Sequence, residues 1–182
     1  EIYETGGAIR ALAQEDSPLG HKIKEIIEAG NLVPNEVVME IVEDFMQKLP
    51  EGKSILFDGI PRSIEQAETL NALLDKAGRT YKAVLIKITE ETALKRLTTR
   101  QICSKCKKVF AADYKSETCN APDCGGELIT RADDNPEASK TRLNAFMTET
   151  QAAINTYKDN MVEIDGEPSI EEVTKLTIQT LQ

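Results

Sequence analysis

The feature that most constrains the fold is residues 54–62, which read SILFDGIPR. The apolar run 54–57 predicts a short buried strand, because the Gly and Pro that follow favour a strand over a helix. Ligands of open α/β sheets bind where parallel strands end. There, Asp58 can hold magnesium or a metal-bound water, Gly59 lets the backbone approach a ligand, and Arg62 offers a planar charged fork for phosphate. A plain strand-to-loop exit with a surface arginine is the alternative that these nine residues leave open.

Size and charge narrow the class of protein. A chain of 182 residues has room for one core with a small insertion. The sequence contains no run of about 18 apolar residues and no apolar leader at its start, so we expect a cytoplasmic protein without a membrane span. The formal net charge of −9 argues against non-specific nucleic-acid binding, although a local arginine cluster can still bind nucleotide phosphates.

Other elements follow from apolar patterning and capping residues. The runs 83–88 and 161–166 predict two further strands, which makes three in all. Helices are expected to begin at the capping residues Ser17, Asn35, Ser63, Thr89, Asn135 and Ser169. Arg96 and Arg100, four positions apart on the helix that starts after Thr89, are expected to project from one face. Alternating strands and helices predict an α/β fold.

Four cysteines fall in one short segment. Cys103 and Cys106 form a Cys-x2-Cys pair, and Cys119 and Cys124 form a Cys-x4-Cys pair. Twelve residues separate the two pairs. Two thiolate pairs joined by a hairpin favour a tetrahedral structural zinc site with all four as ligands. Two disulfides are the alternative, which a cytosolic setting disfavours.

The stretch Asp58–Arg62 followed by Gln66 resembles the signature of adenylate kinases and related nucleoside monophosphate kinases. Thr5, Gly6 and Arg10 match a motif of the same family, residues 29–34 resemble its AMP-cradling loop, and the cysteines match the zinc-bearing lid of many bacterial members. The resemblance covers nearly the whole chain. It implies a P-loop kinase-like parallel sheet flanked by helices, with a helical AMP-binding arm (1–34), a core (35–100 and 136–182) and an inserted zinc-binding lid (101–135).

The resemblance also implies an activity, the reversible conversion of ATP and AMP into two ADP, with Mg²⁺ accompanying ATP. The catalytic side chains would be Arg62, Arg96, Arg100, Arg131 and Arg142. AMP would contact Thr5, Arg10, Asn31, Leu32, Val33, Gly59, Ile60, Pro61 and Gln66, together with Arg62, Arg131 and Arg142. ATP would contact Arg96, Arg100, Val109, Phe110 and Pro168. The carboxylates that would order magnesium-bound water or the lid hinge are Asp58, Asp133 and Asp134. The implied partners are ATP, AMP and ADP, with no nucleic acid and no membrane.

A Gly-x4-Gly-Lys phosphate-binding loop does not occur in these 182 residues. Gly52-Lys53-Ser54 resembles the end of one, but position 47 is Gln and a strand follows instead of a helix. In the family, this loop lies between the first strand and helix, and the sequence here begins just before the Thr-Gly motif. We therefore expect three strands where the family has five, with the central strand lacking, and an isolated polypeptide that is unstable or partnered. With the N-terminal segment present, we expect a monomer.

Two functions remain open at this point: an adenylate kinase, and a non-catalytic zinc-stabilised fragment that binds AMP. A third possible function is nucleic-acid binding through a zinc ribbon, which the negative net charge of the chain disfavours.

Overall fold

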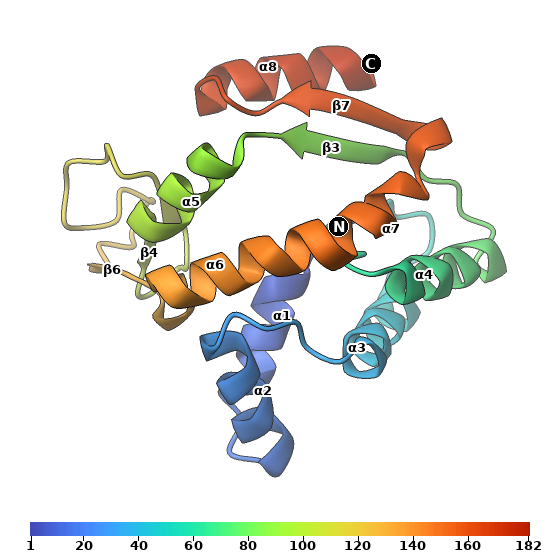
Figure 1. Ribbon diagram of the computed structural model, residues 1–182, viewed down its shortest axis with the longest axis horizontal. Coiled ribbons are helices and arrows are strands. Elements are labelled where there is room, and N and C mark those ends of the chain that lie inside the picture. Colours follow the sequence, from blue (N-terminus) through green and yellow to red (C-terminus); the bar gives the residue numbers. More distant parts are fainter.

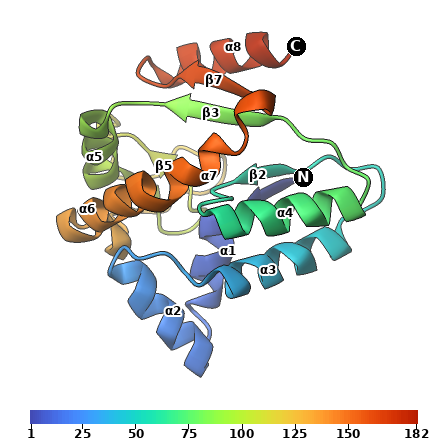
Figure 2. The same cartoon turned by 45° about the vertical axis from the view of Figure 1, so that its right-hand side comes forward.

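The computed structural model describes residues 1–182, apart from the side chain of Ala132. Its core contains two pairs of parallel strands, of which Figure 1 shows one and Figure 2 both. Strand β1 (Ile2–Glu4) pairs with β2 (Leu56–Asp58), and β3 (Ala83–Lys87) pairs with β7 (Met161–Asp165). Among the described residues, no ladder joins the two pairs. The predicted fold class, parallel strands flanked by helices, is confirmed, and the parallel strands form no continuous sheet.

Strand β1 corrects the expected number of strands, which is four in the core and not three. Its three residues have an alternating pattern in which only Tyr3 is buried. Tyr3 packs against Phe45, with ring centroids 4.8 Å apart, and against Phe57. A single buried side chain is too short a pattern to be recognised as a strand from the sequence.

Helices surround the strand pairs on several sides (Figure 2). They are α1 (Thr5–Leu12), α2 (Pro18–Glu28), α3 (Asn35–Lys48), α4 (Ile64–Lys76), α5 (Glu90–Thr99), α6 (Pro136–Ala145), α7 (Gln151–Asn155) and α8 (Ile170–Leu181). A π-helical turn, η2 (Phe146–Thr150), joins α6 to α7, while η1 (Ala132–Asp134) and η3 (Lys158–Asn160) are short 3-10 turns.

Five of the six predicted helix starts have the expected cap. The side chains that accept a hydrogen bond from the first helical turn are Ser17, Ser63, Thr89, Asn135 and Ser169. The prediction for Asn35 is wrong, because Pro34 occupies the cap position and Asn35 is the first residue of α3. The Asn35 side chain instead accepts hydrogen bonds from Ser63 and Gln66.

Each strand pair is covered only in part, and large apolar side chains remain exposed on both. The first pair shares a buried cluster with α3 and α4, composed of Tyr3, Met39, Val42, Leu70 and Leu74. On the second pair and the adjoining helix α8, several large apolar side chains remain exposed, namely Val84, Ile86, Ile170 and Ile178. Ile2 and Leu56 of the first pair are exposed as well, so both pairs bury only part of their apolar area, the dominant favourable term in folding.

The cysteine segment forms a small antiparallel sheet of its own, inserted between α5 and α6. Strand β4 (Gln101–Cys103) lies between β5 (Val109–Phe110) and β6 (Leu128–Ile129). Within the described part of the chain, no helix is long and apolar enough to cross a membrane.

Candidate functional site

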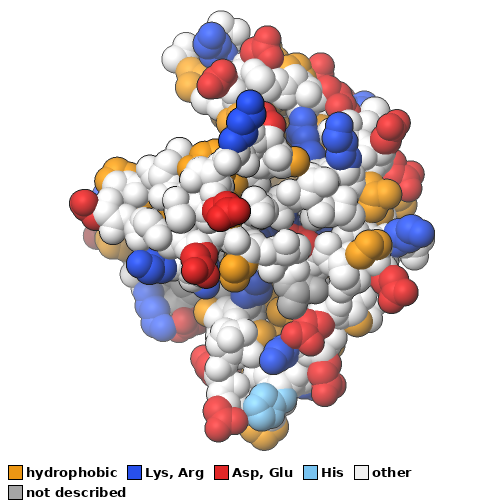
Figure 3. Space-filling view, turned by 90° about the vertical axis from the view of Figure 1, so that its left-hand side faces the viewer, with side chains coloured by type: hydrophobic (Ala, Val, Ile, Leu, Met, Phe, Trp, Pro, Cys, Tyr) orange, Lys and Arg blue, Asp and Glu red, His pale blue; other side chains and the backbone are white. Residues whose placement is uncertain are grey.

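A polar cavity of about 280 Å³ lies among the ends of several elements. Five guanidinium groups line it, those of Arg10, Arg62, Arg100, Arg131 and Arg142. Three carboxylates also line it, from Glu4, Asp58 and Asp133. The excess of positive charge contrasts with the formal net charge of −9 for the whole chain. On the face shown in Figure 3, by comparison, Lys and Arg side chains are interspersed with Asp and Glu. The arginine cavity thus has a local excess of positive charge, which suits an anion.

The five arginines come from five separate segments. Arg10 is on α1, Arg62 follows β2, Arg100 follows α5, Arg131 follows the small sheet, and Arg142 is on α6. Bringing like charges together is unfavourable unless acids or a bound anion compensate them. This arrangement therefore indicates a phosphate site, because guanidinium groups match phosphate oxygens in geometry and charge.

Arg62 is the most constrained of these side chains. Its Nε donates a hydrogen bond of 2.9 Å to the Gly59 carbonyl, and its backbone N–H donates one of 2.7 Å to the Gln66 side chain. Burial lowers the pKa of Arg62, and the charge of Arg142 lowers it further, while Asp58 partly offsets both. An anion in the cavity would relieve this cost of holding a buried cation beside another cation.

Two of the other arginines form ion pairs with acids of η1. Arg100 makes two hydrogen bonds of 2.6 Å to the carboxylate of Asp134, whose side chain has no exposed surface. Arg142 lies 2.8 Å from Asp133. Both acids belong to η1, so the segment after the small sheet is tied to α5 and α6 through the cavity wall.

Within the described chain, the side chain of Arg131 has fewer hydrogen-bond partners than those of Arg62, Arg100 and Arg142. Burial lowers its pKa, followed by the charges of Arg100 and Arg10. Its Nε is buried and has no hydrogen-bond partner among the described residues. A buried donor without a partner is costly, which again points to a missing acceptor.

Thr5 and Gln66 line the same cavity but differ in whether their side chains are hydrogen-bonded. Thr5 is buried, and its hydroxyl has no partner among the described residues. Gln66 is also buried, but its amide donates to Asn35 and accepts from the Arg62 backbone. Thr5 thus has its full hydrogen-bonding capacity free, whereas Gln66 is held in one orientation.

Most of the residues predicted to contact AMP line this cavity: Thr5, Arg10, Asn31, Leu32, Val33, Gly59, Arg62, Gln66, Arg131 and Arg142. Ile60 and Pro61 are adjacent in the chain but do not line it. Two residues that the sequence did not point to, Glu4 and Leu97, also line it. Glu4 bonds Arg10 at 3.0 Å, and this pairing across six positions has no helical or strand spacing that would reveal it in the sequence.

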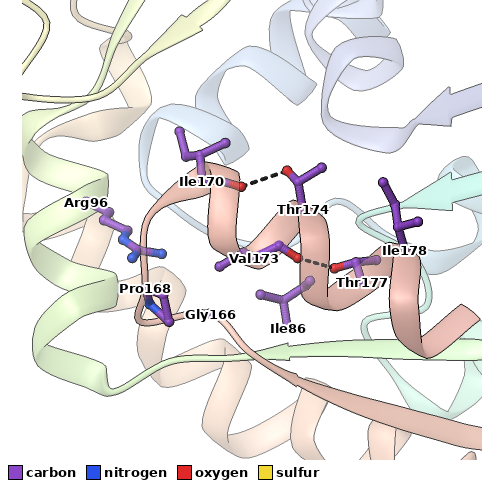
Figure 4. A pocket seen from close by; sticks show the side chains of 9 residues that line it. All are labelled: Ile86, Arg96, Gly166, Pro168, Ile170, Val173, Thr174, Thr177 and Ile178. Carbon is purple, nitrogen blue, oxygen red and sulfur yellow. Dashed lines mark hydrogen bonds between the residues drawn. The ribbon is translucent and has the colours of Figure 1, made fainter.

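A second cavity of about 380 Å³ lies between the strand pair β3–β7, helix α8 and Arg96 (Figure 4). Arg96 and Pro168, both predicted to contact ATP, line it. The hydroxyls of Thr174 and Thr177 donate to carbonyls of their own helix, so the α8 wall is largely apolar. The cavity therefore suits a flat or apolar group.

Arg96 and Arg100, predicted to share a helix face, contact different segments of the chain. Helix α5 ends at Thr99, and Arg100 has extended backbone angles. Arg96 donates to the Glu167 carbonyl beside the second cavity, while Arg100 bonds Asp134 at the first. In this conformation Arg96 lines the second cavity and Arg100 lines the first.

Val109 and Phe110, also predicted to contact ATP, lie on β5. Val109 is exposed, but the Phe110 ring is buried and packs against Tyr114 with centroids 4.4 Å apart. In this conformation only Val109 presents its side chain to solvent.

The four cysteines form one compact cluster whose Sγ atoms all lie within 4.8 Å of one another. Cys103 and Cys124 have Sγ atoms 3.5 Å apart, as do Cys106 and Cys119, and all four are free cysteines. A tetrahedral ion with metal–sulfur bonds of about 2.3 Å requires sulfur atoms roughly 3.8 Å apart. The cluster therefore fits a single metal ion.

The environment of the cluster shifts the pKa values of two of its thiols in opposite directions. Burial raises the pKa of Cys103, but hydrogen bonds from the backbone N–H groups of Cys106 and Lys105 outweigh it and bring the pKa to about 6. Burial raises the pKa of Cys119 to about 12. Because thiolate is the form that ligates metal, a bound cation would offset the cost of deprotonating the buried Cys119 thiol.

Comparison with known proteins gives a consistent result. Residues 2–162 match the family model described as adenylate kinase. An adenylate kinase of Fervidobacterium nodosum is 35% identical over 97% of this chain and 84% of its own length. Those of Kosmotoga olearia and Bacillus pumilus are 36% and 38% identical, over 98% and 93% of this chain and 85% and 80% of their own lengths.

Proposed function

Because the chain belongs to the adenylate kinase family, we propose that it transfers a phosphoryl group reversibly from ATP to AMP, giving two ADP. The observation that carries this proposal is the convergence of Arg10, Arg62, Arg100, Arg131 and Arg142 on one cavity. Phosphoryl transfer needs little covalent help from a protein. Its rate depends on positioning the phosphates and on neutralising charge as the phosphoryl group moves.

The acceptor AMP occupies the first cavity in this proposal. Arg10, Arg62 and Arg142 hold its phosphate, with Gly59 allowing close approach. The base lies against Thr5, Gln66 and the backbone of residues 31–33. The free Thr5 hydroxyl supports this placement, because it is a buried hydrogen-bonding group that a base can satisfy.

In the same proposal, the donor nucleotide ATP lies opposite the acceptor AMP. Arg96, Arg100 and Arg131 face its phosphates, while Val109, Phe110 and the backbone near Pro168 contact its base and ribose. The second cavity supports this assignment, because its largely apolar α8 wall accommodates a planar ring. Asp58 orders magnesium-bound water, since hard carboxylate oxygens suit Mg²⁺ and its water shell. Asp133 and Asp134, which pair with Arg142 and Arg100, order the hinge of the lid. When bound with ATP, Mg²⁺ neutralises phosphate charge.

The three predicted units follow from the need to exclude water. Residues 1–34 form the AMP-binding arm, 101–135 the lid, and 35–100 with 136–182 the core. An arm and a lid that close over the nucleotides protect the phosphoryl group from hydrolysis. We propose that the metal in the lid is zinc, held by Cys103, Cys106, Cys119 and Cys124, where it supplies structure and no chemistry.

A second candidate function is AMP binding without transfer. The observation that favours it is that no Gly-x4-Gly-Lys loop occurs in the 182 residues. Such a protein would bind AMP through the arginine cavity with the same residues and would form no ADP.

One experiment separates the two candidates. ADP formation is measured from ATP and AMP with Mg²⁺, with an AMP-free control, while AMP binding is measured by calorimetry. Turnover that requires AMP, and that falls about 10³-fold or more in Arg62→Ala, supports the kinase. Arg79→Ala is the matched control, because Arg79 is half-buried, does not line the arginine cavity and donates to the Lys53 carbonyl. AMP binding without turnover supports the second candidate, and neither binding nor turnover contradicts both.

A further inference from the structure

Glu167, in the turn between β7 and α8, makes hydrogen bonds to the start of a different helix. One carboxylate oxygen accepts from the backbone N–H of Thr89 at 2.5 Å. The other accepts from the Thr92 hydroxyl at 2.7 Å. These bonds lower the pKa of the Glu167 carboxyl, with the Thr89 N–H as the largest cause, so the carboxylate stays charged at neutral pH.

The geometry is that of a capping box completed by a distant residue. In an ordinary capping box, the acid at the third helical position accepts from the backbone N–H of the cap residue. Helix α8 has this arrangement within its own sequence, between Ser169 and Glu172. In α5, the third helical position is Thr92, which has no carboxylate, and Glu167 takes that part from across the fold. The start of α5 is thereby joined to the turn after β7.

The same residue makes a second attachment to α5 through its backbone. The Glu167 carbonyl accepts a hydrogen bond of 3.2 Å from Arg96, about one turn further along the helix. Figure 4 shows the Arg96 guanidinium directed toward the turn that carries Gly166 and Pro168. The turn is anchored on its other side, because Asp165 accepts from the Glu167 N–H and the Lys87 carbonyl accepts from the Gly166 N–H.

We propose that Glu167 is a positioning residue for the donor nucleotide, a nucleoside triphosphate, because it holds Arg96 and the Pro168 turn at a fixed separation. The inference rests on the proposed function, in which Arg96 faces the donor phosphates and the Pro168 turn contacts the donor base. Without the carboxylate, α5 and the turn can shift relative to each other, and the two contacts to one ligand are no longer aligned. The acceptor site is not attached to Glu167 by any hydrogen bond of the described residues, so its affinity should not change.

The test compares Glu167→Ala, Glu167→Gln and the control Glu163→Ala. Glu163 is an exposed carboxylate on β7 that pairs only with Lys87, so its removal changes charge without touching α5. For each protein, KM is measured separately for ATP and AMP, and equilibrium binding of Mg²⁺ with a non-hydrolysable ATP analogue is measured without AMP. Circular dichroism checks that the helices are retained.

Glu167→Ala should raise KM for ATP and weaken analogue binding about tenfold, which is the scale of one lost charge-assisted hydrogen bond. KM for AMP should stay within about twofold. Glu167→Gln should recover part of the loss, since its amide oxygen still accepts from Thr89. Glu163→Ala should resemble the unmodified protein.

The outcomes separate the two proposals. If the unmodified protein turns over and Glu167→Ala leaves KM for ATP unchanged, or raises both KM values equally, the positioning inference is overturned and the kinase assignment stands. If analogue binding depends on Glu167 but no turnover occurs, the positioning inference stands and the kinase assignment fails. If the unmodified protein binds no analogue, both are overturned.

Discussion

The hydroxyl group of Thr150 donates a hydrogen bond of 3.0 Å to the backbone carbonyl of Arg62, across 88 positions of sequence. Thr150 ends the π-helical turn η2 and is buried. Single π turns within α-helices occur often at functional sites, where they redirect a side chain. Here the turn brings a hydroxyl against the loop that carries the central arginine.

Thr150→Val should therefore lower turnover more than it lowers stability. The substitution keeps the shape of the side chain but leaves the Arg62 carbonyl without its donor, so we expect a loss of about 1 kcal/mol in unfolding free energy. Turnover should fall several-fold, and Thr150→Ser should restore it. Thr148→Val is the control, because Thr148 bonds only a carbonyl of its own helix. Equal effects of the two valine substitutions on turnover would contradict the link to Arg62.

Local interactions account for what the sequence predicted well. Five helix caps were predicted because a capping side chain bonds amides within three residues. The Asn35 cap was predicted wrongly because its side chain has distant partners, Ser63 and Gln66, that the sequence order does not reveal. The pairing of Arg100 with Asp134 and the role of Glu167 were missed for the same reason, since both depend on contacts between remote segments.

Thr5→Val should separate binding from stability. The Thr5 hydroxyl is buried without a partner, so replacing it with a methyl group should leave the unfolding free energy unchanged or raise it by up to about 1 kcal/mol. If the hydroxyl bonds the AMP base, AMP affinity should fall about fivefold to tenfold. Urea unfolding and calorimetric titration with AMP measure the two effects. An AMP affinity that stays the same would remove Thr5 from the acceptor site.

Asp134→Asn should destabilise the protein and lower turnover together. The neutral amide would present an N–H group to the Arg100 fork, leaving one guanidinium N–H unsatisfied beside a fully buried side chain. We expect a loss of about 2–4 kcal/mol in unfolding free energy. Asp75→Asn, on an exposed position of α4, is the control and should change it by less than about 0.5 kcal/mol. A small effect at Asp134 would mean that the ion pair is not maintained in solution.

Removal of metal should act on the lid first. Treatment with a strong chelator should release one zinc ion per chain, measured by a colorimetric assay. It should also increase hydrogen exchange in residues 101–129 more than in α3 and α4, because the lid has only a small buried cluster around Cys103, Phe110 and Cys119. Cys119→Ser should bind zinc more weakly and show the same increase. Purified protein that contains no metal, and whose four thiols react at once with a thiol reagent, would argue against the site.

The contact between Gly30 and helix α6 can be tested with a matched pair of glycines. Both Gly30 and Gly52 have positive φ angles, +79° and +75°, which side chains rarely adopt. A Cβ atom at Gly30 would lie within van der Waals overlap of the Ala138 carbonyl oxygen and Cα, whereas a Cβ at Gly52 would meet nothing within 4 Å. Alanine at either position therefore carries the same backbone cost, and only Gly30→Ala adds the clash.

We expect Gly52→Ala to lower the unfolding free energy by about 1 kcal/mol and Gly30→Ala by about 3 kcal/mol or more. Gly30→Ala should also weaken AMP binding, because the clash pushes residues 31–33 away from α6 at the edge of the arginine cavity. Urea unfolding of both variants, with AMP titrations of each, measures these differences. Equal destabilisation by the two substitutions, with equal AMP affinity, would mean that Gly30 is required only for its backbone conformation and that the close approach to α6 does not hold the acceptor loop in place.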